Sequence, residues 1–259
     1  MPVIGKCRLC LEEPIELQES HYIPAALYPD KVTLEYATPR STGTVQREVT
    51  SPLLCRHCEE LFNRNGECEV LRHIAPKLTN PSRKKCGFPL HERLRLALPR
   101  EDHPDIRRFS GDDLGINMDH FVYFMLSVVW RGAVHQWPDV DGSLTVPLPL
   151  GGFEDPIRQY LLGKAPFPPH TAVIVFVCSD DDSRRRWIVP GSNVEVKCLS
   201  LKFLALGIAF RAMMGRHIPQ FYLDRCCRSP RKCIFYGDLS SKTKEIIGTL
   251  EAMRDRNMG

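Results

Sequence analysis

Two Cys-x-x-Cys pairs near the start of the chain constrain its fold more than any other feature. They are Cys7-x-x-Cys10 and Cys55-x-x-Cys58, and 44 residues separate them. The short turn within such a pair lets both thiolates reach one metal ion, and two pairs complete the tetrahedral tetrathiolate site that is typical of structural zinc. The sequence therefore predicts that these four cysteines bind one structural Zn²⁺, which organises the N-terminal part of the chain.

The remaining cysteines favour a reduced compartment. The chain has 259 residues and 11 cysteines, and no apolar stretch follows its basic start, so no secretory signal is visible. A core of this size needs no disulfide framework, and the seven other cysteines are expected to be small buried residues or free thiols. The most apolar tracts, 121–130 and 203–214, are shorter than a membrane-spanning helix. We therefore expect a cytoplasmic protein that does not enter a membrane.

Changes in composition along the chain predict an α+β fold in two parts. Residues 1–80 form the zinc module, residues 81–115 form a basic, Pro-containing connection, and residues 116–259 form an α+β domain with a mixed or antiparallel sheet. Helices are predicted over 59–63 and 67–74 with a break at Gly66, over 117–130 with one face in a core, over 155–162 and over 242–254. Strands are predicted over 172–178, over 186–189 as its hairpin partner, and over 194–198, part of 201–210 and 220–223.

The first 75 residues also resemble a known family. The order Cys7-x-x-Cys10, Ser20-His21-Tyr22-Ile23-Pro24 and Leu53-Leu54-Cys55-x-x-Cys58-Glu59 is similar to the zinc-containing HNH nuclease module. The same residues resemble a group of uncharacterised bacterial proteins that carry a Ser-His-x-Ile-Pro variant. In that group a helix with Leu-Ser-x-x-Trp-Arg follows, here Leu126 to Arg131.

This resemblance implies a ββα-metal fold and a metal-dependent endonuclease, a hydrolase that acts on DNA or RNA. His21 stands at the position of the general base, where a neutral imidazole takes a proton from attacking water. Ser20 replaces the acidic residue that usually precedes the histidine, and Glu59 replaces the last His or Asn. Glu59, with Asn63 one turn later or with Glu60, is then expected to hold a catalytic Mg²⁺ or Mn²⁺.

Two other functions remain open. The zinc scaffold could form a non-catalytic module that binds nucleic acid or protein, or the role of the chain could lie in its C-terminal half. The formal net charge of +4 suits a polyanion without requiring one. The basic residues of 83–108 could contact phosphates. A second metal or phosphate site could form from Cys226, Cys227 and Cys233 with Arg225, Arg228, Arg231 and Lys232. A solvated surface and buried thiols are the alternatives.

Overall fold

In the computed structural model the chain forms an α+β fold, as the sequence predicts. The structure describes residues 2–27, 34–37, 42–45, 48–75, 77–80, 85–102, 106–138, 143–180, 183–195, 197–230 and 232–238. The predicted helix over 242–254 lies outside these residues. Among them, no helix combines the length and apolar character that crossing a membrane requires.

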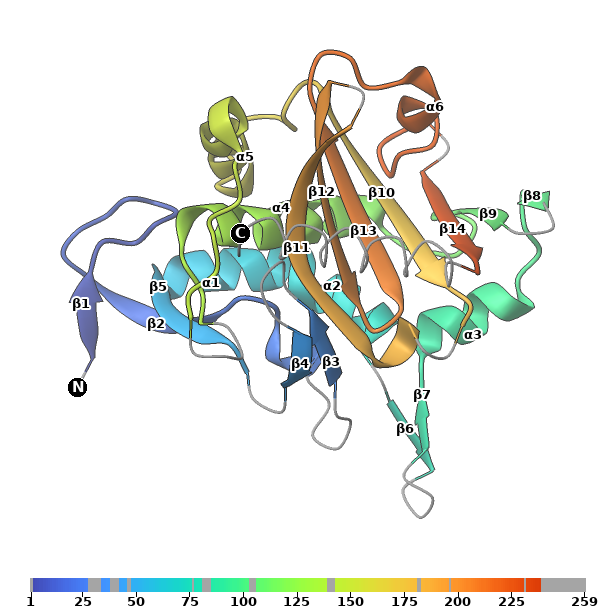
Figure 1. The fold of residues 1–259 in the computed structure, drawn as a ribbon, viewed down its shortest axis with the longest axis horizontal. Helices are drawn as coiled ribbons and strands as arrows, with labels where there is room; N and C mark the ends of the chain where they lie inside the picture. The colour runs from blue at the N-terminus through green and yellow to red at the C-terminus, as the bar shows by residue number, and fades with distance from the viewer. Residues whose placement is uncertain are drawn as a thin grey trace, which may run out of the picture.

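The N-terminal part contains a small antiparallel sheet followed by a long helical segment (Figure 1). Its strands, in the order in which they pair, are β1 (Val3–Gly5), β2 (Ile15–His21) and β5 (Thr50–Cys55). The helical segment consists of α1 (Arg56–Phe62), a π-helical turn (Asn63–Glu67) and α2 (Cys68–Ile74). A 3₁₀ turn (Ala25–Leu27) follows β2.

The predicted break at Gly66 is wrong, because the helical segment continues through it. Gly66 lies in the π-helical turn, and a Cβ atom there would come within 3.1 Å of the backbone nitrogen of Phe124. Glycine therefore allows close contact between two helices at this position, instead of ending one.

A nine-stranded mixed sheet forms the rest of the framework, in the order β4-β3-β11-β12-β13-β10-β14-β9-β8. Its strands in chain order are β3 (Leu34–Ala37), β4 (Thr42–Val45), β8 (Glu101–Asp102), β9 (Ile106–Ser110), β10 (Thr171–Cys178), β11 (Arg186–Glu195), β12 (Cys198–Ala205), β13 (Ile208–Met214) and β14 (Cys233–Gly237). Neighbouring strands are antiparallel except β10 with β14 and β11 with β3. A separate hairpin joins β6 (Lys77–Asn80) to β7 (Lys85–Gly87).

Three predictions about this sheet are wrong. The strand predicted over 194–198 is not one strand, because β11 ends at Glu195 and β12 begins at Cys198 after a turn in which Lys197 has a φ of 63°. The strand at 186–189 is not the hairpin partner of β10, which pairs with β13 and β14, whereas β11 pairs with β12 and β3. Residues 220–223 form a short helix, α6 (Gln220–Leu223), because Pro219 begins a turn in which the Asp224 N–H donates to the Gln220 carbonyl. Strand β9 lies within the predicted connection 81–115, which also contains α3 (Pro89–Leu96).

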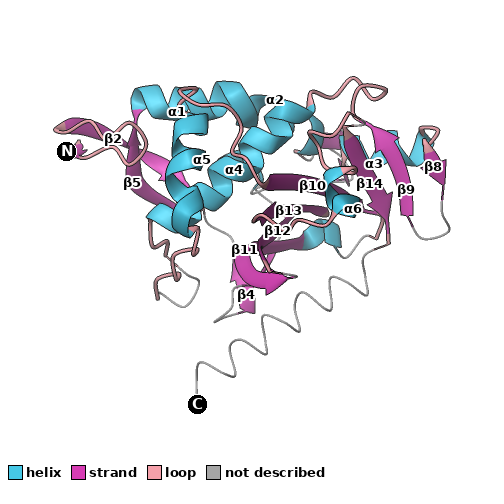
Figure 2. Ribbon diagram, turned by 90° about the horizontal axis from the view of Figure 1, so that it is seen from above, coloured by secondary structure: helices cyan, strands magenta, loops and turns pink. Residues whose placement is uncertain are grey.

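Helix α4 (Met118–Val134) lies at the centre of the molecule. Figure 2 shows it between the sheet and the segment that contains α1 and α2. The prediction of a start at Asn117 is confirmed, since its side chain accepts a hydrogen bond from the Asp119 N–H. Residues 121–132 are all buried, so the expectation that one face alone would be buried is wrong. The predicted helix over 155–162 is confirmed as α5 (Glu154–Leu161).

Aromatic side chains hold α4 on both of its sides. Phe124 lies 5.4 Å from Phe210 of the sheet, between ring centroids, and Trp130 lies 6.2 Å from Phe62 of α1. One continuous cluster of buried residues extends from the first Cys-x-x-Cys pair through α4 to the sheet. The division of the chain at residues 80 and 115 stays a prediction.

Candidate metal centre and the polar cluster beside it

The two cysteine pairs are held at the same end of the small sheet. Cys7 and Cys10 lie in the turn between β1 and β2, where the Leu11 N–H donates to the Cys7 carbonyl at 2.9 Å. Cys55 is the last residue of β5, and Cys58 lies in the first turn of α1. Strand β5 pairs with β2 in a register that places Cys55 opposite Leu17. The second cysteine pair therefore lies beside the first.

A β-bulge in β5 brings the second strand of the site into contact with the first cysteine pair. Leu54 and Pro52 pair with successive residues of β2, which leaves Leu53 as the extra residue. The Leu53 carbonyl accepts a hydrogen bond from the Arg8 N–H of the first pair, at 3.2 Å. Pro52 has no N–H to donate in a regular strand ladder, and such residues are found at bulges.

The four cysteines could hold a zinc ion. Their sulfur atoms all lie within 4.8 Å of one another, and the sulfurs of Cys10 and Cys55 are 3.9 Å apart. A tetrahedron with Zn–S bonds of about 2.3 Å has S···S edges of about 3.8 Å, so this spacing fits the ion. The Cys55 N–H donates to the Cys7 sulfur at 3.3 Å, which is the amide contact expected of a zinc knuckle.

Without a cation, this cluster resists full ionisation. Burial raises the pKa of Cys10 to about 11, and a hydrogen bond with the Cys7 sulfur raises the pKa of Cys58. The hydrogen bond from Cys58 lowers the pKa of Cys7 to about 4, because it stabilises that one thiolate. A bound dication favours all four thiolates together, which is the donor set of structural zinc.

A second set of polar residues lies beside the cysteines, and we call it the His21 cluster. Its members are Ser20, His21, Glu48, Glu59, Glu67 and Arg131. The Ser20 hydroxyl, which is fully buried, donates to Glu59 Oε1 and accepts from the Leu54 N–H at 3.1 Å. The residue before His21 and the carboxylate of α1 are therefore in direct contact.

Glu48 fixes the ring of His21. The His21 Nε2 atom lies 2.6 Å from Glu48 Oε2, and because a carboxylate only accepts hydrogen bonds, Nε2 carries the proton. In the neutral imidazole, Nδ1 then has a free electron pair. The side chain of His21 is 30% exposed, so water can reach it.

Arg131 joins α4 to the other members of the cluster. Its guanidinium group donates to the His21 carbonyl at 2.7 Å and to a carboxylate oxygen of Glu67. It also lies 4.8 Å from the centroid of the Phe62 ring, and only 2% of the residue is exposed. Burial raises the pKa of Glu59, and the positive charge of Arg131 offsets part of that effect.

Asn63, the third predicted catalytic residue, does not join this cluster. Its side chain is exposed and accepts a hydrogen bond from the Cys68 thiol at 3.0 Å. Glu67 occupies the place beside Arg131 instead. The Leu-Ser-x-x-Trp-Arg helix contained the only sequence signal for Arg131, while nothing in the spacing pointed to Glu48 or Glu67.

Several residues of the other predicted basic and cysteine groups are buried or have partners within the chain. Arg107 lies 4.8 Å from the Tyr236 ring centroid, and Arg100 pairs with the exposed Asp113. Arg83 and Lys84 lie outside the described residues. Cys226, Cys227 and Cys233 are buried. Within the part of the chain that the structure describes, the four knuckle cysteines form the one group of three or more potential metal ligands.

Comparison with known proteins adds no relative. No protein-family model matches the chain, and neither the curated proteins nor the solved structures contain a significant match. What the chain does must therefore be argued from its own residues.

Proposed function

We propose that the chain is a divergent HNH-like, metal-dependent nuclease in which His21 is the general base. The observation that carries the proposal is the contact between Ser20 and Glu59, which brings the β2 residue next to His21 against the first turn of α1. The zinc cluster holds both elements at one end of the small sheet, so it supplies the scaffold and takes no part in the chemistry. DNA and RNA are both candidate substrates.

His21 has the features of a general base. With Nε2 donating to Glu48, the Nδ1 atom accepts a proton from a water molecule whose oxygen attacks the phosphorus atom. The bond from phosphorus to the leaving oxygen of the sugar then breaks. The pairing with Glu48 also stabilises the imidazolium that forms, in the way that a carboxylate orients a catalytic histidine.

Glu59 is the proposed ligand for the catalytic ion. Ser20 engages Oε1, which leaves Oε2 for a second interaction. A Mg²⁺ or Mn²⁺ ion bound there would polarise the phosphate and stabilise the leaving oxygen. Water and substrate phosphates commonly complete the coordination of such an ion, so one protein carboxylate is a workable anchor.

Cleavage of plasmid and single-stranded DNA tests this proposal. The zinc-loaded wild-type protein is compared with His21→Ala, in Mg²⁺, Mn²⁺ or Ni²⁺. We expect His21→Ala to reduce the rate by about 100-fold or more, the usual contribution of a general base. His57→Ala is the matched control, because His57 is an exposed histidine of the same module and its removal should leave the rate unchanged.

A second candidate is a non-catalytic zinc-scaffolded module that binds nucleic acid or protein. Burial favours it, because burial raises the pKa of Glu59 and so disfavours the charged carboxylate that a metal ion needs. The exposed side chain of Asn63, which accepts a hydrogen bond from the Cys68 thiol, favours it as well. Absence of cleavage by wild-type protein that contains one zinc per chain would support this candidate over the nuclease.

A further inference from the structure

The segment 211–233 is strongly basic. This segment contains six basic residues and one acidic residue, so its formal charge is +5, whereas the whole chain carries +4. The remaining residues together therefore carry −1. A polyanion should be attracted to such a segment.

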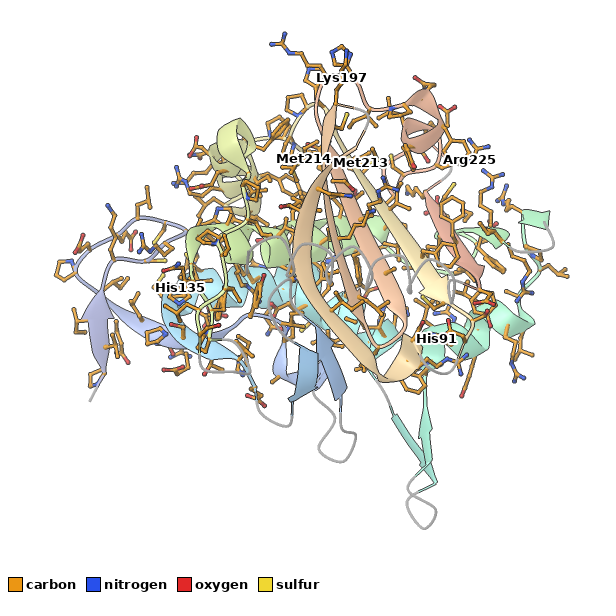
Figure 3. The ribbon with its side chains drawn as sticks, viewed as in Figure 1. His91, His135, Lys197, Met213, Met214 and Arg225 are labelled. Carbon is orange, nitrogen blue, oxygen red and sulfur yellow. The ribbon has the colours of Figure 1, made fainter. Side chains whose placement is uncertain are left out.

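A small hydrophobic cluster anchors the segment to one end of the large sheet. Its buried members are Ala172, Cys198, Met213, Ile218 and Cys226. Three basic residues each directly precede a member of this cluster: Lys197, His217 and Arg225. Figure 3 shows Lys197, Met213, Met214 and Arg225 toward the same end of the sheet. The cluster therefore gathers basic side chains from the β11–β12 turn and from both sides of α6.

Aromatic rings lie among these cations. Phe221 of α6 is 59% exposed, and the guanidinium carbon of Arg225 lies 4.2 Å from its ring centroid. Arg211 lies 4.8 Å from the ring of Tyr222, and Arg228 lies 4.8 Å from the ring of Phe167. We call Lys197, Arg216, Phe221, Arg225 and Arg228 the α6 surface.

Phe221 is the one aromatic residue among the large hydrophobic residues that are exposed in the described part of the chain. The guanidinium group of Arg225 lies over one face of the ring, and the residue as a whole is 59% exposed. An open aromatic face beside a cation is the arrangement on which a nucleic-acid base stacks while its phosphate is neutralised. A duplex keeps its bases stacked inside, so this arrangement suits single strands.

We propose that the α6 surface binds single-stranded nucleic acid, with Phe221 stacking on a base and Lys197, Arg216 and Arg225 neutralising phosphates. This extends the proposed function by naming the ligand and a second place where it is held. Binding here requires no catalysis at His21. The two proposals can therefore fail separately.

Fluorescence anisotropy with a labelled 20-nucleotide oligo-dT tests this inference. The full zinc-loaded chain with His21→Ala is used as the background, so that cleavage does not disturb the measurement. Phe221→Ala should weaken binding by about 5- to 100-fold, the range for loss of one base-stacking contact, with an unchanged salt dependence. Arg225→Gln should weaken binding and also reduce the slope of log K against log salt by about 0.7.

The matched control is Ile4→Ala. Ile4 is exposed to the same extent as Phe221, 59%, but lies in β1 of the small sheet, and its removal should leave binding unchanged. Equal affinity of wild-type and Phe221→Ala protein for oligo-dT would overturn the proposal, as would equal binding of a 20-base-pair duplex. Binding of phosphatidylserine vesicles that depends on Phe221, without binding of oligo-dT, would also overturn it.

Discussion

The four cysteines and the His21 cluster both have a member in α1, Cys58 and Glu59, but they balance charge in opposite ways. The cysteine cluster brings four ionisable thiols within 4.8 Å of one another, with hydrogen bonds from Cys55 N–H and among the thiols themselves. The His21 cluster contains three carboxylates and its own buried cation, Arg131. The four thiols need a bound metal ion in order to be fully ionised. In the His21 cluster, Arg131 balances part of the negative charge.

The largest effect should come from removing zinc. Structural zinc sites in small peptides contribute about 10–16 kcal/mol of apparent binding free energy, which is comparable with the whole stability of a domain, about 5–15 kcal/mol. We expect one zinc per chain in the wild-type protein and substantially less in Cys7→Ser, with unfolding of β1, β2 and α1. Metal analysis and hydrogen exchange measure the two quantities.

Cys68→Ser is the control for this prediction. Cys68 is exposed and lies outside the cysteine cluster, so its replacement should keep one zinc per chain. A wild-type protein that is purified without zinc and is still fully folded would contradict the metal centre.

The second effect concerns the internal cation. Arg131→Met should destabilise the fold by about 3–5 kcal/mol, because it leaves the carboxylate of Glu67 without its buried partner. Glu67→Gln in the same chain should recover part of the loss, since the uncompensated charge is then absent. Urea unfolding of the two single variants and the double variant gives the coupling energy.

The exposed pair of Arg100 and Asp113 provides the comparison for Arg131. Both of these side chains are about half exposed, so Arg100→Met should change stability little. If Arg131→Met lowered the stability as little as Arg100→Met, Arg131 would not be balancing buried charge. The distinction between the cysteine cluster and the His21 cluster would then be lost.

The cysteine cluster could be predicted from sequence because each knuckle places two ligands by local geometry alone. Fold class and helix α4 were also predictable, since an N-cap and a long apolar tract are local signals. The His21 cluster was predicted only in part. Its contacts join residues as distant in sequence as His21 and Arg131, and spacing along the chain does not determine such contacts.

The errors in the sheet have a similar origin. Strands β10 and β11 are consecutive in the chain, yet β12 and β13 lie between them in the sheet. Pairing of this kind depends on which strand faces fit together in the core, and the local apolar pattern is alike for each candidate strand. At Gly66 a residue that usually ends a helix was instead required for contact with α4.

The smallest predicted effect concerns Glu59 itself. Burial raises the pKa of its carboxyl group, so the folded protein binds this proton more tightly than the unfolded chain does. The resulting stability is present below the ordinary glutamate range and is lost as pH rises through the raised pKa. Glu59→Gln stays neutral and keeps an oxygen for Ser20. The variant should therefore gain stability relative to wild type as pH rises above the ordinary glutamate range, as measured by urea unfolding.

The effect of added Mn²⁺ on stability tests whether the His21 cluster also binds a metal ion, as the cysteine cluster is expected to do. If Glu59 holds a catalytic ion, millimolar Mn²⁺ should stabilise the wild-type protein at pH 8, because an ion that binds only the folded state shifts the unfolding equilibrium. Glu59→Gln, with zinc intact, should show a smaller shift. Equal shifts would mean that Mn²⁺ binds elsewhere. Arg131 would then be the cation of the His21 cluster in place of a metal, which would favour the binding module over the nuclease.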